Sequence, residues 1–259
     1  MGAGRLGRVW AVAANTFRET VRERVLYNLV FFAVIMTLSG LLLGQLSIRQ
    51  DEKIIKDIGL AAMEMFGTLI AIFIGVGLVA KEIERRSLHA LLAKPLSRDE
   101  FFLGKFVGLG VTLLVNVALM AAGLALTLLA TGRGVDQRLL AAIYPIYLGL
   151  LLVVALAVLF STLTSTVMAA VCTIGLVVAG HFSDVIRNIK DVRPDAPSWL
   201  ISLLYYALPN FRNFDFKDRV AHGDPVALAT MGWVTAYAAA YIGVVLLAGL
   251  TVFRSRELN

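Results

Sequence analysis

Long apolar runs alternate with short charged segments along the chain. Six of these runs are long enough to form membrane-spanning helices, because a hydrocarbon core about 30 Å thick needs about 20 helical residues. In lipid the backbone must satisfy its own hydrogen bonds, which favours helices. The pattern predicts an all-α polytopic membrane protein forming one transmembrane domain over 1–259, with spans at 26–46, 59–80, 106–130, 139–160, 164–182 and 226–253.

The stretch 139–182 is too long for a single span. A cluster of hydroxyl side chains interrupts it, and this cluster predicts a tight turn between the fourth and fifth spans. Its members are Ser161, Thr162, Thr164, Ser165 and Thr166.

Residues 5–24 have the pattern of an amphipathic helix. One arc of the helix is apolar and the opposite arc is polar and mainly basic, which is typical of a helix lying in the headgroup plane beside anionic lipid. A plain extension of the first span is the alternative. The apolar arc contains Leu6, Val9, Trp10, Ala13, Phe17 and Val21, and the polar arc contains Arg8, Asn15, Arg18, Glu19 and Arg22.

The charged loop 81–105 contains a predicted helix over 82–92. Pro95 disfavours helix at the residue before it, and Ser97 with Glu100 has the spacing of a capping box that starts a new helix. A short amphipathic helix with an apolar face is suited to docking in a groove of another protein. A solvated loop is the alternative. The apolar face consists of Leu88, Leu91 and Leu92.

The same loop resembles the first cytoplasmic loop of the ABC type-2 permeases, the membrane subunits of ATP-driven exporters. Their pattern is roughly E-x-E-x-G-T-L-x-x-L-L-x-x-P-x-S-R, followed after several residues by G-K. Arg86 and Ser87 depart from it, standing where glycine and threonine are usual. The matching positions are Glu82, Glu84, Leu88, Leu91, Leu92, Pro95, Ser97, Arg98, Gly104 and Lys105.

The resemblance implies that this loop holds a coupling helix that contacts an ATPase subunit. It also implies a second permease copy or a related permease, with the translocation path between the two. The expected coupling residues are Glu82, Glu84, Arg86, Leu88, Leu91, Leu92, Pro95, Ser97 and Arg98.

The chain has no phosphate-binding loop of the form G-x-x-x-x-G-K-[ST], since Phe106 follows Gly104-Lys105. ATP and magnesium are therefore expected in the partner subunit, with no cofactor or catalysis in this chain. The leading interpretation is an exporter permease. A non-transporting relay that controls an envelope assembly or enzyme is the alternative. An intramembrane enzyme is disfavoured, because only Glu64 and scattered histidines are available as catalytic groups.

The predicted external stretch 183–225 contains the apolar segment SWLISLLYYAL between Pro197 and Pro209. It is too short to span and fits a re-entrant or interfacial helix. Aromatic side chains suit the interface, and the resemblance places such a segment near the outer exit, which makes Trp199, Tyr205 and Tyr206 candidate pathway residues. Residues 210–216 alternate aromatic and polar, as in an extended edge or a membrane-surface rim.

Glu64 is the only acidic residue inside a predicted span. An ionisable group in the membrane is costly, which suggests a cargo contact or a buried pairing. Snorkelling to the outer interface is the alternative, since Glu64 lies roughly 9 Å from the end of its span.

Composition agrees with the membrane prediction, with 59% hydrophobic and 16% charged residues. The net charge of +6 does not indicate nucleic-acid binding, because the basic residues flank the spans. One side of the predicted topology collects 13 Lys and Arg, against 5 in the short loops of the other side. The positive-inside rule then places both termini in the cytoplasm, and we expect a multi-pass protein of the cell (inner) membrane in contact with lipid.

Two small-xxx-small patterns permit close helix approach, within the chain or across a dimer. They are Gly40 with Gly44 and Ala236 with Ala240.

Overall fold

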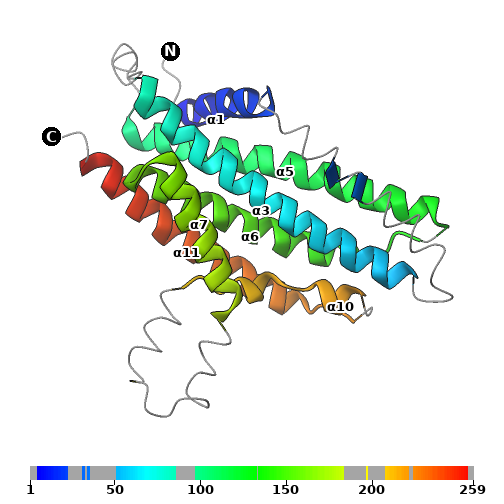
Figure 1. Ribbon diagram of the computed structural model, residues 1–259. Helices are drawn as coiled ribbons and strands as arrows, with labels where there is room; N and C mark the ends of the chain where they lie inside the picture. The colour runs from blue at the N-terminus through cyan, green and yellow to red at the C-terminus, as the bar shows by residue number, and fades with distance from the viewer. Residues whose placement is uncertain are drawn as a thin grey trace.

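The computed structural model describes residues 5–22, 31–32, 34–35, 51–85, 97–132, 134–183, 197, 208–221 and 224–255. The described residues form helices and contain no strand (Figure 1), which confirms the all-α prediction. The elements are α1 (Arg5–Arg22), α3 (Asp51–Arg85), α5 (Arg98–Ala130), α6 (Arg138–Leu163), α7 (Thr166–His181), the 3₁₀ helix η1 (Phe211–Phe214), α10 (Lys217–Ala221) and α11 (Leu228–Ser255).

Four helices are long and apolar enough to cross a membrane, at Lys53–Gly77, Asp99–Ala130, Arg138–Leu163 and Leu228–Phe253. They coincide with four of the predicted spans. The helix at the predicted third span begins at Arg98, eight residues before the expected 106. The fifth prediction corresponds to the shorter apolar helix α7. Most of 26–46 lies outside the described residues, so the count of six spans stays a prediction.

Helix α6 is the central helix of the bundle and contacts α3, α5, α7 and α11. After Arg138 it carries no charged residue, and most of its side chains are buried. Gly67 and Gly75 let α3 approach α6 closely, since a Cβ at Gly75 would lie 2.6 Å from the Ala157 Cβ. Such close packing is a main source of helix association in lipid, where apolar surface alone provides little drive.

The turn predicted from the hydroxyl cluster is present. Helix α6 ends at Leu163 and α7 begins at Thr166, with Thr164 and Ser165 extended between them. Ser161 and Thr162 remain helical, and their hydroxyls are satisfied within α6 by donating to the carbonyls of Val158 and Leu159. The turn therefore contains only Thr164 and Ser165 of the hydroxyl cluster.

Helix α1 lies along the first half of α5, at the end of the bundle opposite α10 (Figure 1). We call these two ends the α1 end and the α10 end. Ala13, Thr16 and Thr20 of α1 are buried, whereas Leu6 and Trp10 are exposed. The predicted apolar arc of α1 is thus divided between a protein contact and the outer surface.

Before α11 the chain folds back onto the α10 end of the bundle. Phe211 and Phe214, three residues apart in η1, are both buried, as is Phe216. A 3₁₀ helix has three residues per turn, so the two rings share one face. The extended-edge alternative for 210–216 is therefore wrong. Trp199, Tyr205 and Tyr206 lie outside the described residues.

Candidate functional site

The capping box predicted at the start of α5 is confirmed. The backbone N–H of Glu100 donates to Ser97 Oγ at 3.3 Å, and the backbone N–H of Ser97 donates to Glu100 Oε2 at 3.1 Å. Arg98 is the first helical residue. Two backbone donors that a helix start leaves unpaired are thereby satisfied.

Glu100 also joins α5 to α1. Arg8 Nε donates to Glu100 Oε2 at 2.9 Å, and Arg8 Nη2 donates to Oε1 at 2.7 Å. The carboxylate side chain is 7% exposed. Two parallel charge-assisted bonds fix both distance and orientation, so α1 is held at the point where the predicted coupling loop enters α5.

Two glycines of α5 provide the surface on which α1 rests. A Cβ at Gly104 would lie 2.7 Å from the Val12 Cβ, and a Cβ at Gly108 would lie 2.7 Å from both the Ala13 carbonyl oxygen and the Thr16 Cβ. Sequence reasoning used Gly104 only as part of a motif and did not single out Gly108. Their four-residue spacing was the signal, since small residues at that spacing permit close helix contact.

The predicted coupling residues are only partly described. Glu82 and Glu84 belong to α3, which continues without a break to Arg85. Arg86, Leu88, Leu91, Leu92 and Pro95 lie outside the described residues. The docking face of the loop therefore stays a prediction.

A groove of about 520 Å³ lies between α3 and α7. Its walls are mainly apolar, and its polar groups include Glu64 and His181. The groove is lined by Ala61, Glu64, Met65, Thr68, Leu69, Ile72, Ile174, Val177, Val178, His181 and Phe182.

Glu64 is the centre of an ionic cluster at the α10 end of this groove. Its Oε1 lies 3.2 Å from His181 Nε2, and its Oε2 accepts a hydrogen bond from Lys217 Nζ. The side chains of Glu64 and Lys217 are 22% and 20% exposed. The structure therefore pairs the partly buried Glu64 carboxylate with His181 and Lys217.

His181 is fixed on both ring nitrogens. Nδ1 lies 2.9 Å from the Val177 carbonyl oxygen, and Nε2 faces the Glu64 carboxylate. Both neighbours are acceptors, so both contacts are hydrogen bonds when each nitrogen carries a hydrogen. The ring also stacks on Phe211, with centroids 5.3 Å apart. His181 thus connects α7, α3 and η1.

Lys217 brings the segment before α11 into the cluster. Its Nζ lies 3.7 Å from Asp215 Oδ1 in addition to its bond with Glu64. Burial opposes the charged form of this ammonium, but the Glu64 and Asp215 carboxylates outweigh it and raise the pKa of Lys217. The ammonium is therefore charged at neutral pH and ties α10 to α3.

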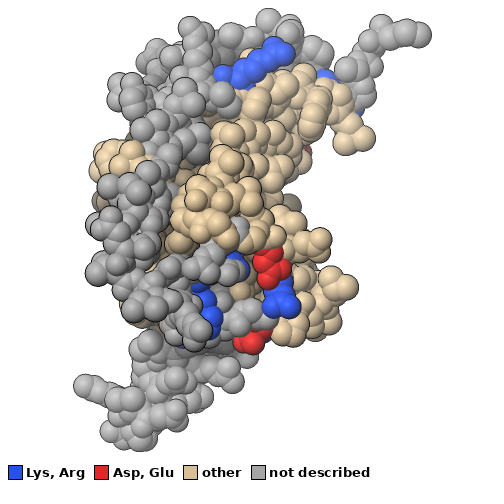
Figure 2. Space-filling view, turned by 90° about the vertical axis from the view of Figure 1, so that its right-hand side faces the viewer, with Lys and Arg blue, Asp and Glu red and all other residues tan. Residues whose placement is uncertain are grey.

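Figure 2 shows the molecule from the side on which α10 lies in Figure 1. Basic and acidic side chains lie next to one another in the lower half of this face, below a broad band of other residues.

The four long apolar helices define a multi-pass helical membrane protein. The chain matches the family model described as ABC-2 family transporter protein over residues 10–186. This match covers well over half of the chain, and the protein belongs to that family. A search of curated proteins finds no match. Membership makes the chain a membrane permease component of an ABC transporter, a class that works in general with an ABC ATPase.

Proposed function

We propose that this protein is the membrane-spanning subunit of an ATP-driven exporter and forms the translocation path as a dimer, with itself or with a related permease. The family match over 10–186 supports this proposal most strongly. A separate nucleotide-binding subunit would hold the ATP and magnesium. The protein would lie in the cell (inner) membrane. Both of its termini would lie in the cytoplasm, as the Lys and Arg distribution indicates.

The arrangement at the α1 end supports transmission of motion from the ATPase. Helix α3 is continuous from Asp51 to Arg85, so a displacement at 82–92 acts directly on the helix that carries Glu64. On the other side of the loop, the Glu100 carboxylate fixes α5 to α1 through Arg8. The loop is thus anchored to two rigid elements, and its movement shifts α3 relative to the α1–α5 pair.

The groove between α3 and α7 supplies a wall for the path. Its apolar lining suits an amphipathic molecule, and Glu64 and His181 place polar groups among its lining residues. Trp199, Tyr205 and Tyr206 would lie near the exit. Opening the α10 end of the groove would require the Glu64 cluster to change, because that cluster joins α3, α7 and α10.

An affinity purification from native membranes tests the proposal. The unaltered chain should recover a stoichiometric P-loop ATPase, and Leu88→Asp/Leu91→Asp should abolish both its recovery and coupled ATP hydrolysis. Val135→Asp is the matched control, since Val135 is an exposed apolar residue in the loop between α5 and α6. Unchanged ATPase recovery and ATP turnover in the double variant would contradict the docking role of 82–92. If the unaltered chain recovered no ATPase, the exporter assignment would be wrong.

A further inference from the structure

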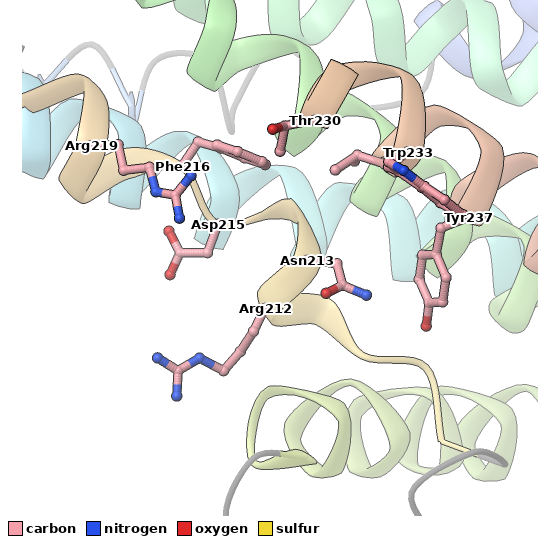
Figure 3. A pocket seen from close by; sticks show the side chains of 9 residues that line it. Arg212, Asn213, Asp215, Phe216, Arg219, Thr230, Trp233 and Tyr237 are labelled. Atoms are coloured by element: carbon pink, nitrogen blue, oxygen red, sulfur yellow. The ribbon is translucent and has the colours of Figure 1, made fainter. Parts of the chain in front are cut away.

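A second cavity lies between the η1–α10 segment and the first turns of α11, and Figure 3 shows its lining. Its volume is about 400 Å³. Arg212, Asp215 and Arg219 lie together on one side, Trp233 and Tyr237 lie on the other, and Asn213 is between them. The full lining is Arg212, Asn213, Asp215, Phe216, Arg219, Thr230, Trp233, Val234 and Tyr237.

The charge of this cavity is positive. Asp215 is its single acidic lining residue, and its Oδ1 lies 3.7 Å from Lys217 Nζ. The lining therefore carries two guanidinium groups, those of Arg212 and Arg219, against one carboxylate. Guanidinium groups present several donors in a planar fork that matches phosphate or carboxylate oxygens. Asn213 and Thr230 add neutral hydrogen-bonding groups at the same cavity.

The opposite wall is aromatic and held in place. The Tyr237 hydroxyl accepts a hydrogen bond from the backbone N–H of Asn210 at 2.8 Å, and its ring lies 5.9 Å from that of Phe214. Trp233 is 78% exposed. It lies five residues into α11, near the start of a candidate span, and indole rings are enriched at the membrane interface.

The surface of α11 beyond Trp233 is open. Gly232, Ala236 and Ala240 are exposed, and a Cβ at Gly232 would meet no atom within 4 Å. The predicted close-packing pair Ala236 and Ala240 therefore has no partner among the described residues of this chain. These exposed small residues form an apolar stripe on α11, the small-residue track, which extends from Trp233 towards the middle of the helix.

We propose that this cavity binds the headgroup of an anionic amphiphile, with a phosphate or carboxylate at Arg212 and Arg219 and the attached chain against Trp233 and the small-residue track of α11. The ligand lies in the membrane leaflet at the α10 end. In the proposed topology this is the outer leaflet. Only that assignment rests on the proposed function. The site is separate from the α3–α7 groove, and its occupant need not be the transported cargo.

Quenching of Trp233 by brominated lipid tests this site in the full-length chain. The chain has three tryptophans, and Trp10→Phe/Trp199→Phe leaves Trp233 as the emitting residue. The protein is reconstituted in phosphatidylcholine vesicles, and brominated phosphatidylglycerol is compared with brominated phosphatidylcholine. We expect preferential quenching by the anionic lipid, reduced roughly fivefold by Arg212→Gln or by Arg219→Gln and abolished by both together.

Lys53→Gln is the matched control, because Lys53 is an exposed basic residue near the first turn of α3, away from the cavity lining. It should leave the preference unchanged, and Arg212→Lys/Arg219→Lys should retain part of it. Equal quenching by both lipids in the unaltered protein overturns the proposal, as does a preference that survives loss of both arginines.

Inorganic phosphate added to vesicles without anionic lipid distinguishes the two sources of the anion. An arginine-dependent change in Trp233 emission with phosphate, without any lipid preference, would identify a soluble anion as the ligand and overturn the amphiphile. Because no ATPase is present in these assays, their outcome is independent of whether the exporter assignment holds.

Discussion

The carboxylates of Glu100 at the α1 end and Glu64 at the α10 end are stabilised in different ways. At the α1 end, Glu100 lies at the start of its helix, where its own capping box and the helix dipole favour a negative charge. At the α10 end, Glu64 lies within a candidate span, away from both ends of its own helix α3. Glu100 gains one long-range partner, whereas Glu64 depends on two, His181 and Lys217.

The difference shows how location decides what a charge requires. A carboxylate at a helix N-terminus is stabilised by local structure, and Arg8 adds the connection to α1. A carboxylate within a span is expensive unless tertiary contacts supply its counter-charges. The α10 end is therefore expected to be the more sensitive to loss of a single ionic partner.

The largest expected effect is at the Glu64 cluster. Lys217→Met removes a largely buried counter-charge and should lower the free energy of unfolding by about 2 kcal/mol, because Glu64 then remains in a poorly solvated position. Unfolding by a titrated denaturing detergent measures this. Adding Glu64→Gln should recover part of the loss, and Lys53→Met is the control at an exposed lysine. A loss no greater than that of the control would mean that the cluster does not stabilise the fold.

Glycine substitutions should affect the α1 end almost as strongly. Gly108→Ala places a Cβ 2.7 Å from the Ala13 carbonyl oxygen and should destabilise the protein by about 1–2 kcal/mol. Gly77→Ala in α3 meets no atom within 4 Å and should stabilise by about 0.5 kcal/mol through helix propensity. Opposite signs in the same unfolding assay are expected. Equal effects would show that α1 does not depend on close approach to α5.

A double-mutant cycle compares the two ionic contacts directly. Arg8→Gln with Glu100→Gln should give a small favourable coupling energy, because Arg8 is one-third exposed and solvent screens the pair. Glutamine retains an oxygen for the Ser97 N–H, so the cycle isolates the charge. The cycle for Lys217 with Glu64 should give a larger value. A larger coupling energy for Arg8 with Glu100 than for Lys217 with Glu64 would contradict the contrast between the two ends.

The smallest effect is expected at the cap itself. Ser97→Ala removes the side-chain acceptor of the Glu100 N–H and should cost about 0.5–1 kcal/mol. Ser165→Ala is a matched control, because Ser165 occupies the N-cap of α7 without a side-chain cap hydrogen bond. The two variants differ only in whether a cap bond is lost, so equal stabilities would show that the Ser97 cap contributes nothing measurable.

Functional assays extend the comparison to transport. Glu64→Gln should change ATP hydrolysis by the assembled transporter, because it alters the contact that joins α3 to α7 and α10. Wild-type activity with reduced stability would assign the cluster a structural role alone. The amount of co-purified ATPase is the control for assembly.

Local patterns account for what could be predicted from the chain. Apolar run length predicted six spans, four of which coincide with long apolar helices, because the membrane imposes both a length and a backbone hydrogen-bond requirement on each helix. The hydroxyl cluster within the longest run predicted the α6–α7 turn. The spacing of Ser97 and Glu100 predicted the capping box for the same reason, since the interacting groups lie within one turn.

Long-range contacts were decided by tertiary structure. The sequence marked Glu64 as unusual, but His181 and Lys217 lie 117 and 153 residues away, and no local period relates them. The same holds for Arg8 with Glu100 and for the cavity between η1–α10 and α11. Charge and apolar length act along the chain and can be read from it, whereas ion pairs and cavities depend on which helix faces meet, and that is fixed only when the helices pack.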